Sequence, residues 1–161
     1  MPKYLDLKKL EKELVRQPFD DYIFDLCNVV SSRSTCVRRH VGAVIVKDHS
    51  IVSTGYNGAP RGCAHCIDIG CLREKQKIEA GKNVELCRGA HAEQNAISQA
   101  ARWGISLEGA EIYCYVMPCS MCTKAIIGSG IRKVHFVKEY PDSLARKLAE
   151  EAKINIVHHA R

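Results

Sequence analysis

The alternation of helical and extended patterns in the second half of the chain most restricts how it folds. Between residues 91 and 159, three segments have the apolar spacing of helices and three read as strands. In chain order they are 91–104 (helix), 111–117 (strand), 119–130 (helix), 132–138 (strand), 141–152 (helix) and 154–159 (strand). Strands that are joined by helices in this way pair in parallel through right-handed crossovers.

The first half of the chain predicts a helix followed by a hairpin. Residues 18–34 repeat apolar side chains at helical spacing, and residues 40–58 read as two strands around a turn at 47–49. The run 41–46 is apolar enough for a central strand. Together with the later alternation, this pattern predicts an α/β fold: a three-layer α/β/α sandwich around a five-stranded mixed sheet.

Length and composition indicate one globular domain. The chain has 161 residues, of which 46% are hydrophobic and 26% charged, so we expect a single domain over 1–161 with a cysteine-rich insert at about 58–90. No apolar run approaches the roughly 18 residues that span a membrane. The first residues, MPKYLDLKKLEKEL, have no signal-peptide core, which predicts a cytoplasmic protein. They fit an amphipathic interface helix and a solvated helix equally well.

Cysteine content points to metal binding or catalysis. The chain has nine cysteines, and the odd count, the full-sized core and the missing signal argue for reduced thiols. The formal net charge of +6 favours anionic partners such as nucleotides or nucleic acid.

Two separated motifs predict a catalytic zinc site. In MPCSMCTKAI (117–126), Cys119 and Cys122 lie three residues apart in the first turn of a helix, so their sulfurs point the same way. A helix N-terminus favours the thiolate that zinc binds. His91 heads the preceding helix, and both helices begin at the same end of the sheet. Three protein ligands leave one position open for water, as a catalytic zinc requires.

Glu93 completes this chemistry as the proton carrier. It stands two residues after His91 in RGAHAEQNAI (88–97), beside the metal without being needed as a ligand. H-x-E followed by P-C-x-x-C is the signature of zinc-dependent nucleobase deaminases. The alternative is a histidine that caps a helix and two buried cysteines.

The chain resembles the deoxycytidylate deaminases over roughly residues 19–157. The matching segments are VGAVIVKD (41–48), TGYNGAP (54–60), HAEQNAI (91–97), PCSMCTKAII (118–127) and, more loosely, KVHFVKEYPD (133–142). The resemblance implies the cytidine deaminase-like fold and hydrolysis of dCMP to dUMP and ammonia, which supplies dUMP for thymidylate synthesis. It also implies that Glu93 passes protons from water to N3 of cytosine and to the leaving amine.

The resemblance further suggests substrate contacts. Asn57 matches a position that holds the sugar or base, the Ala92 N–H lies beside the cytosine carbonyl, and Tyr140 matches an aromatic position near the substrate. Arg33 is the candidate for the phosphate, because arginine pairs bidentately with such oxygens. A turn role for Asn57, a solvated Arg33 and a Tyr140 at the core edge are the alternatives.

Some relatives bind a second, structural zinc through the regions that match the insert. On this resemblance the expected ligands are Cys36, Cys66, Cys71 and Cys87, with His65 as the substitute for Cys66. Four sulfurs complete a tetrahedral structural site, and the alternative is a reduced loop without metal. Cys63 is left as a spare. Cys27 and Cys114 stand in apolar stretches and are expected in the core.

The family also implies assembly and regulation. Its members are commonly homohexamers with dCTP and dTTP as effectors and with magnesium, and the loop 56–62 is the expected effector contact. Competing functions are deamination of tRNA adenosine or of free cytidine. The basic cluster for a tRNA is Arg33, Arg38, Arg39 and His40. A zinc knuckle that binds nucleic acid on a deaminase scaffold is a third possibility, but it has no use for Glu93. Nucleic-acid and membrane partners are therefore not expected.

Overall fold

The computed structural model describes residues 16–79 and 82–161. The N-terminal segment for which the sequence suggests a helix lies outside the described residues. None of the described helices is long and apolar enough to cross a membrane.

One five-stranded mixed sheet organises the chain, in the order β2-β1-β3-β4-β5. The strands are β1 (Gly42–Lys47), β2 (Ser50–Tyr56), β3 (Glu111–Cys114), β4 (Lys133–Phe136) and β5 (Asn155–His158). β1 pairs antiparallel with β2 and β3, whereas β3, β4 and β5 run parallel. The hairpin turns at Asp48 and His49, both with positive φ, as a tight turn between twisted strands requires. The predicted mixed sheet is thus confirmed.

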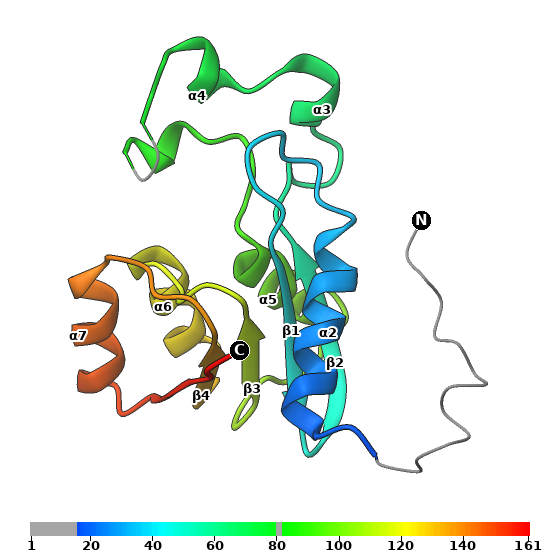
Figure 1. Ribbon diagram of the computed structural model, residues 1–161, viewed down its shortest axis with the longest axis vertical. Helices are drawn as coiled ribbons and strands as arrows, with labels where there is room; N and C mark the ends of the chain where they lie inside the picture. Colours follow the sequence, from blue (N-terminus) through cyan, green and yellow to red (C-terminus); the bar gives the residue numbers. More distant parts are fainter. Residues whose placement is uncertain (1–15, 80–81) are drawn as a thin grey trace.

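Helices cover both faces of this sheet. On one face α2 (Phe19–Ser31) packs its buried side chains Ile23, Phe24 and Cys27 against β1 and β3 (Figure 1). The other face carries α5 (Ala92–Arg102), α6 (Ser120–Gly128) and α7 (Ser143–Glu151). These layers form the α/β/α sandwich that the alternating pattern predicts. Cys27 and Cys114 are fully buried in the two cores, as expected.

A glycine lets α5 lie directly on the sheet. A Cβ at Gly55 of β2 would come within 2.2 Å of the Ala92 carbonyl oxygen and 2.3 Å of the Ala96 nitrogen. These contacts are with backbone atoms that cannot move independently of the helix. Gly55 therefore sets the depth at which the start of α5, and with it His91, is held.

Strands β3 and β4 are shorter than the sequence predicts. The Tyr115 carbonyl accepts the N–H groups of both Val137 and Lys138, so two residues of one strand face one residue of the other. Pairing resumes only as an isolated bridge between Val116 and Lys138. Such a bulge bends the strand. Here the extra residue is on the continuation of β4, so the chain bends at Val137 and Lys138.

The cysteine-rich insert joins β2 to α5. It contains α3 (Cys66–Ile69), α4 (Leu72–Lys75) and the 3₁₀ turn η1 (Val84–Leu86). Its two ends meet where Gly58 and Ala90 exchange backbone hydrogen bonds of 3.2 and 2.9 Å. Figure 1 shows α3 and α4 past one end of the sheet, so the insert lies above the region where α5 begins.

Candidate metal and catalytic site

His91 is held at the first position before α5. It occupies the N-cap of that helix, and its backbone N–H donates to the Gln94 side-chain oxygen at 2.9 Å. This contact satisfies one of the N–H groups that a helix start leaves without a partner. The imidazole then projects from a defined backbone, with Nδ1 directed at two sulfurs.

The two sulfurs come from the start of α6. Cys119 is the N-cap of α6 and Cys122 lies one turn further, fully buried. His91 Nδ1 lies 3.5 Å from Cys119 Sγ and 3.3 Å from Cys122 Sγ, and the three ligand atoms form one group within 4.8 Å. With bonds of about 2.3 Å to sulfur and 2.0–2.1 Å to nitrogen, tetrahedral zinc separates such atoms by about 3.5 Å. The three residues therefore fit a zinc ion.

The electrostatics of the trio favour a metal-binding thiolate. The Cys122 thiol and the His91 imidazole hydrogen-bond to the Cys119 sulfur and lower the pKa of the Cys119 thiol to about 4. The sulfur also stands at a helix N-terminus, where partial positive charge stabilises an anion. A thiolate at neutral pH is the form that zinc requires.

Glu93 is buried beside these ligands. Its side chain is only 6% exposed, although carboxylates are rarely buried without a charged partner. Burial raises the pKa of the Glu93 carboxyl above its ordinary value, and the charge of His91 acts against this shift. A buried carboxyl with a raised pKa, at the edge of a pocket, suits a group that both takes and gives protons.

Asp142 ties α6, which carries the two candidate cysteine ligands, to α7, a role that the sequence analysis missed. Its carboxylate accepts the Ser120 N–H at 2.8 Å, in the first turn of α6, and the Ala145 N–H at 3.0 Å, in the first turn of α7. Although partial burial acts the other way, these N–H groups lower the pKa of the Asp142 carboxyl. The available signal was Pro-Asp-Ser before a helical pattern, which predicts only the cap of α7.

Replacing Asp142 by Ala is expected to weaken both helix starts. An N-cap substitution of this kind costs about 0.5–2 kcal/mol, and the loss here also frees the turn between Cys119 and Cys122. We expect a lower unfolding temperature together with faster zinc loss to a chelator. Asp142→Asn, which keeps an accepting oxygen, serves as the control and should recover most of the stability. An unchanged chelation rate in Asp142→Ala would show that α6 does not need this tether.

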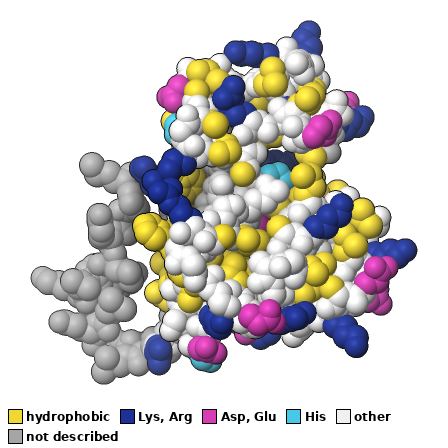
Figure 2. Space-filling view, turned by 180° about the vertical axis from the view of Figure 1, so that it is seen from behind, with side chains coloured by type: hydrophobic (Ala, Val, Ile, Leu, Met, Phe, Trp, Pro, Cys, Tyr) yellow, Lys and Arg dark blue, Asp and Glu magenta, His cyan; other side chains and the backbone are white. Residues whose placement is uncertain are grey.

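A pocket opens from the trio toward the insert. It is lined from one side by His91, Glu93 and Cys119 and from the other by insert residues such as Arg73 and Cys87. Figure 2 shows a hollow between the insert and the rest of the molecule, with basic and histidine side chains inside it. The pocket thus joins the candidate metal ligands to positively charged groups.

The arginines in this pocket are not the one that the sequence singled out. Arg33 is exposed just after the end of α2, because hydrogen bonds from Arg33 and Ser34 back to the helix end turn the chain there. It is not among the described residues that line the pocket, whereas Arg38, Arg39 and Arg73 are. Nη1 of Arg38 and Nε of Arg73 are buried without a hydrogen-bond partner among the described residues. Buried donors without partners are costly, so these two arginines replace Arg33 as candidates for an anion.

The other predicted contact residues do line the pocket. Ala92 is buried at the start of α5, and Tyr140 packs partly against the larger core. The Asn57 side chain accepts from Ser34 Oγ and from the Val41 N–H, and it donates to the Arg39 carbonyl. Asn57 therefore organises the segment from Ser34 to Val41, with one amide hydrogen left for a ligand.

The cysteines of the insert gather without closing a metal site in the structure. Cys36, Cys66, Cys71 and Cys87 all line the same pocket. Burial first, and then the charges of the other three cysteines, raise the pKa of the Cys66 thiol. Within the part of the chain that the structure describes, their sulfurs do not form a group within 4.8 Å as the His91 trio does. His65 Nδ1 is buried without a partner nearby, and Cys63 is exposed. The second site stays a prediction.

Fold and site together define a class of protein. In this mixed sheet, His91 and Cys119 precede two helices, Cys122 lies one turn into the second helix, and a buried glutamate lies beside them. This is the arrangement of the zinc-dependent deaminases. Residues 18–138 match the family model described as the cytidine and deoxycytidylate deaminase zinc-binding region. The chain belongs to this family.

Individual relatives agree with this assignment. The chain is 37% identical over 142 residues to ComE operon protein 2 of Bacillus subtilis, covering 88% of this chain and 71% of that protein. It is 34% identical over 142 residues to a deoxycytidylate deaminase of Schizosaccharomyces pombe, covering 88% of this chain but only 44% of that one. A crystal structure of dCMP deaminase from the cyanophage S-TIM5 in complex with dCMP and dUMP aligns with a TM-score of 0.74 and 28% identity. It covers 90% of this chain and 100% of that one.

Proposed function

We propose that this chain catalyses the hydrolytic deamination of dCMP to dUMP and ammonia, and so supplies dUMP for thymidylate synthesis. The observation that carries the proposal is the His91–Cys119–Cys122 trio with Glu93 buried beside it, at the base of a pocket that contains arginines. The similar deoxycytidylate deaminase and the cyanophage enzyme with dCMP and dUMP support this substrate.

In this reaction some residues of the chain would bind zinc and another would transfer protons. His91, Cys119 and Cys122 would hold zinc, which lowers the pKa of a water molecule to about 7. The Glu93 carboxylate would take a proton from water and deliver it to N3 of cytosine as the oxygen adds to C4. It would then take the second proton from the hydroxyl on C4 and give it to the departing 4-amino group, which leaves a carbonyl oxygen on C4. Burial raises the pKa of the Glu93 carboxyl above its ordinary value, and this makes its carboxylate a stronger base toward the proton of water.

The phosphate of dCMP would complete the pocket. Arg38 and Arg73 each leave a buried donor without a partner, and a phosphate accepts such donors in charge-assisted hydrogen bonds. Arg73 also bonds to the carbonyls of Glu79 and Lys82, so the insert itself orients this arginine. Recognition of the phosphate would then distinguish the nucleotide from free deoxycytidine.

Arg38→Ala tests this assignment. Hydrogen bonds to charged groups contribute about 1.5–3 kcal/mol, so we expect KM for dCMP to rise by roughly 10- to 100-fold. Slow turnover of deoxycytidine should stay unchanged, because that substrate has no phosphate. Arg33→Ala is the matched control on the neighbouring surface and should leave both substrates unaffected. An equal loss for dCMP and deoxycytidine would place Arg38 elsewhere than at the phosphate.

The activity itself is tested by ammonia release from five substrates side by side. They are dCMP, CMP, deoxycytidine, dCTP and a tRNA anticodon stem-loop. Preferential turnover of dCMP is the expected result. Turnover of the stem-loop or of deoxycytidine ahead of dCMP would replace the proposal by the corresponding deaminase. No turnover with zinc present, together with salt-dependent binding of single strands, would favour a nucleic-acid-binding module.

We also propose a structural zinc in the insert, held by Cys36, Cys66, Cys71 and Cys87 with His65 as the alternative ligand. Its support is the shared pocket, the low exposure of 7% for both Cys66 and Cys71, and the partnerless nitrogen of His65. Cys71→Ser should lower the zinc content by one ion per chain and reduce thermal stability. Cys63→Ser, an exposed cysteine of the same loop, should change neither. An unchanged metal count in Cys71→Ser would remove this site.

Regulation and assembly are proposals that rest on the family resemblance. They comprise a homo-oligomer, commonly a hexamer, dCTP and dTTP as effectors with magnesium, and a contact in the loop 56–62. The whole chain, 1–161, would act as one domain, and its nine free cysteines support a reducing, cytoplasmic location. Kinetics that do not respond to dCTP or dTTP would contradict the effector proposal.

A further inference from the structure

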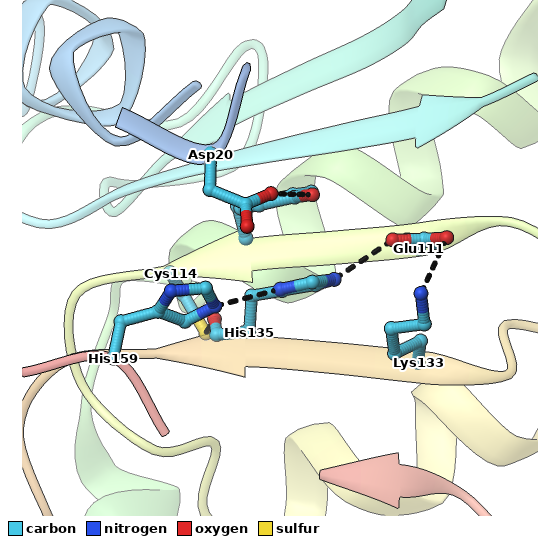
Figure 3. A network of polar contacts seen from close by, with 7 residues as sticks. Asp20, Glu111, Cys114, Lys133, His135 and His159 are labelled. Carbon is cyan, nitrogen blue, oxygen red and sulfur yellow. Dashed lines mark hydrogen bonds and ion pairs between the residues drawn. The ribbon is translucent and has the colours of Figure 1, made fainter. Parts of the chain in front are cut away.

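A second cluster of metal-binding side chains lies on the opposite face of the sheet from the His91 trio. His135 points from β4 toward the α2 side, because its neighbours Val134 and Phe136 belong to the core under α5, α6 and α7. Asp20 reaches the cluster from the first turn of α2, and His159 reaches it from the residue after β5. Figure 3 shows these three side chains together.

One nitrogen of His135 is already occupied. Its Nε2 lies 2.8 Å from Glu111 Oε2, and the other oxygen of Glu111 accepts from Lys133 Nζ at 2.9 Å. A carboxylate can only accept, so the hydrogen of His135 is on Nε2. The lone pair of Nδ1 therefore faces His159 Nε2 at 2.9 Å, where it accepts a hydrogen bond from the neighbouring ring (Figure 3).

Asp20 supplies the anion. One ligand atom each from Asp20, His135 and His159 lies within 4.8 Å of the others. The Tyr113 hydroxyl donates to Asp20 Oδ1 at 2.7 Å, and the Tyr113 ring stacks on the His135 ring at 4.0 Å, so one residue orients both. Arg161 pairs instead with Asp21 and Asp25. Among residues 16–79 and 82–161, no Lys or Arg forms an ion pair with Asp20.

We propose that Asp20, His135 and His159 bind a divalent first-row transition metal ion through the Asp20 carboxylate, His135 Nδ1 and His159 Nε2. Two nitrogens 2.9 Å apart, each about 2.1 Å from an ion, subtend about 90°. That angle belongs to five- or six-coordinate geometry, in which two imidazoles and one carboxylate share a face of the metal. Asp20 and His159 are only partly buried, so water has access to the remaining positions.

Glu111 is the positioning residue of this site. A metal-binding histidine usually donates its other ring N–H to a carboxylate, which fixes the tautomer and makes the ligand nitrogen more basic. Glu111 makes this contact with His135 and is itself held by Lys133. Glu111 thus supplies the carboxylate that usually supports a metal-binding histidine. Two histidines that only form a hydrogen bond with each other do not require such a carboxylate.

The ion would link three segments that are distant in the sequence. It would join the start of α2 to β4 and to the end of the last strand, on a side where Phe24 already contacts the rings of Tyr113 and His159. Its donors are nitrogen and oxygen, whereas the catalytic trio and the insert offer sulfur. Metal ions that prefer hard or intermediate donors would therefore enter this site without displacing zinc from the thiolates.

Calorimetric titration with Ni²⁺ tests the proposal on the untagged, zinc-loaded protein. We expect the wild type to bind one more equivalent of Ni²⁺ per chain than His159→Asn or Asp20→Asn. Glu111→Gln should retain that equivalent with an affinity lower by roughly 10- to 100-fold, the usual effect of losing an outer carboxylate. His158→Asn is the matched control, because the adjacent histidine stacks on Phe136 and bonds to the Val137 carbonyl instead.

Zinc content and circular dichroism show whether each variant is folded before it is titrated. Two substitutions at different ligands keep the test decisive if one of them fails to fold. Wild-type protein that binds no Ni²⁺ would overturn the proposal. So would Ni²⁺ binding by Asp20→Asn or His159→Asn that equals binding by the wild type, since the three side chains would then form a hydrogen-bonded cluster only.

Discussion

Glu93→Gln is expected to abolish turnover of dCMP while the protein keeps its zinc. The amide fills the same volume but can neither take a proton from water nor return one to the leaving amine. A single acid–base step contributes about 10²–10⁴ in rate. Glu93 would act in several steps of one turnover, so we expect kcat to fall by at least about 10⁴. Zinc analysis and ammonia release on the same sample provide the measurement.

Stability separates this effect from misfolding. The side chain is 6% exposed and burial raises the pKa of its carboxyl, which means that the fold tolerates rather than requires the charge. Glu93→Gln should therefore unfold at the same or a higher temperature than the wild type. Glu93→Ala, which leaves a cavity, should lose both activity and some stability. More than about one per cent of wild-type kcat in Glu93→Gln would assign proton transfer to another group.

The fold was predictable because its elements carry strong local signals. The apolar period changes between strand and helix at nearly every boundary after residue 91, and the hairpin has a turn at Asp48 and His49 that the structure confirms. The lengths of β3 and β4 were wrong in the prediction. The bulge at Tyr115 depends on which carbonyl the N–H groups of Val137 and Lys138 reach, and no local pattern records that choice.

The site was predictable only where chemistry restricts the residue type. His91, Cys119 and Cys122 stand at helix starts whose relative position follows from the parallel crossovers, so the trio could be assembled from the sequence. The arginines could not. No local feature of the sequence distinguishes Arg33 from Arg38 and Arg39. The turn after α2 and the position of the insert decide which of them lines the pocket.

Clusters of residues that are distant in the chain could not be predicted either, because they depend on how the helices pack. Asp20 and His135 are brought together by the packing of α2 across the sheet, and neither lies in a motif with metal-ligand spacing. Asp142 was visible as a helix cap, but its second hydrogen bond to Ser120 depends on the angle between α6 and α7. In both cases the function of a side chain is set by a contact that local periodicity does not encode.

Cys122→Ser is expected to remove the metal of the His91 trio, and with it nearly all activity. A hydroxyl at this position remains protonated at neutral pH and is a far poorer zinc ligand than a thiolate. The remaining His91 and Cys119 cannot hold zinc tightly as a pair, so the zinc content should fall by one ion per chain. Because zinc binds only the folded state, the unfolding temperature should fall as well, and added zinc should no longer raise it.

Cys114→Ser isolates the metal effect from the effect of placing a hydroxyl in the core. Cys114 and Cys122 are both fully buried, but Cys114 contacts the His135 carbonyl at 3.7 Å and is outside the trio. Both substitutions should therefore cost stability, while only Cys122→Ser should lose zinc and turnover. Equal zinc content in the two variants would mean that His91 and Cys119 do not depend on Cys122. The metal would then be held by a different set of residues, and proton transfer at the metal would no longer explain why Glu93 is buried beside the His91 trio.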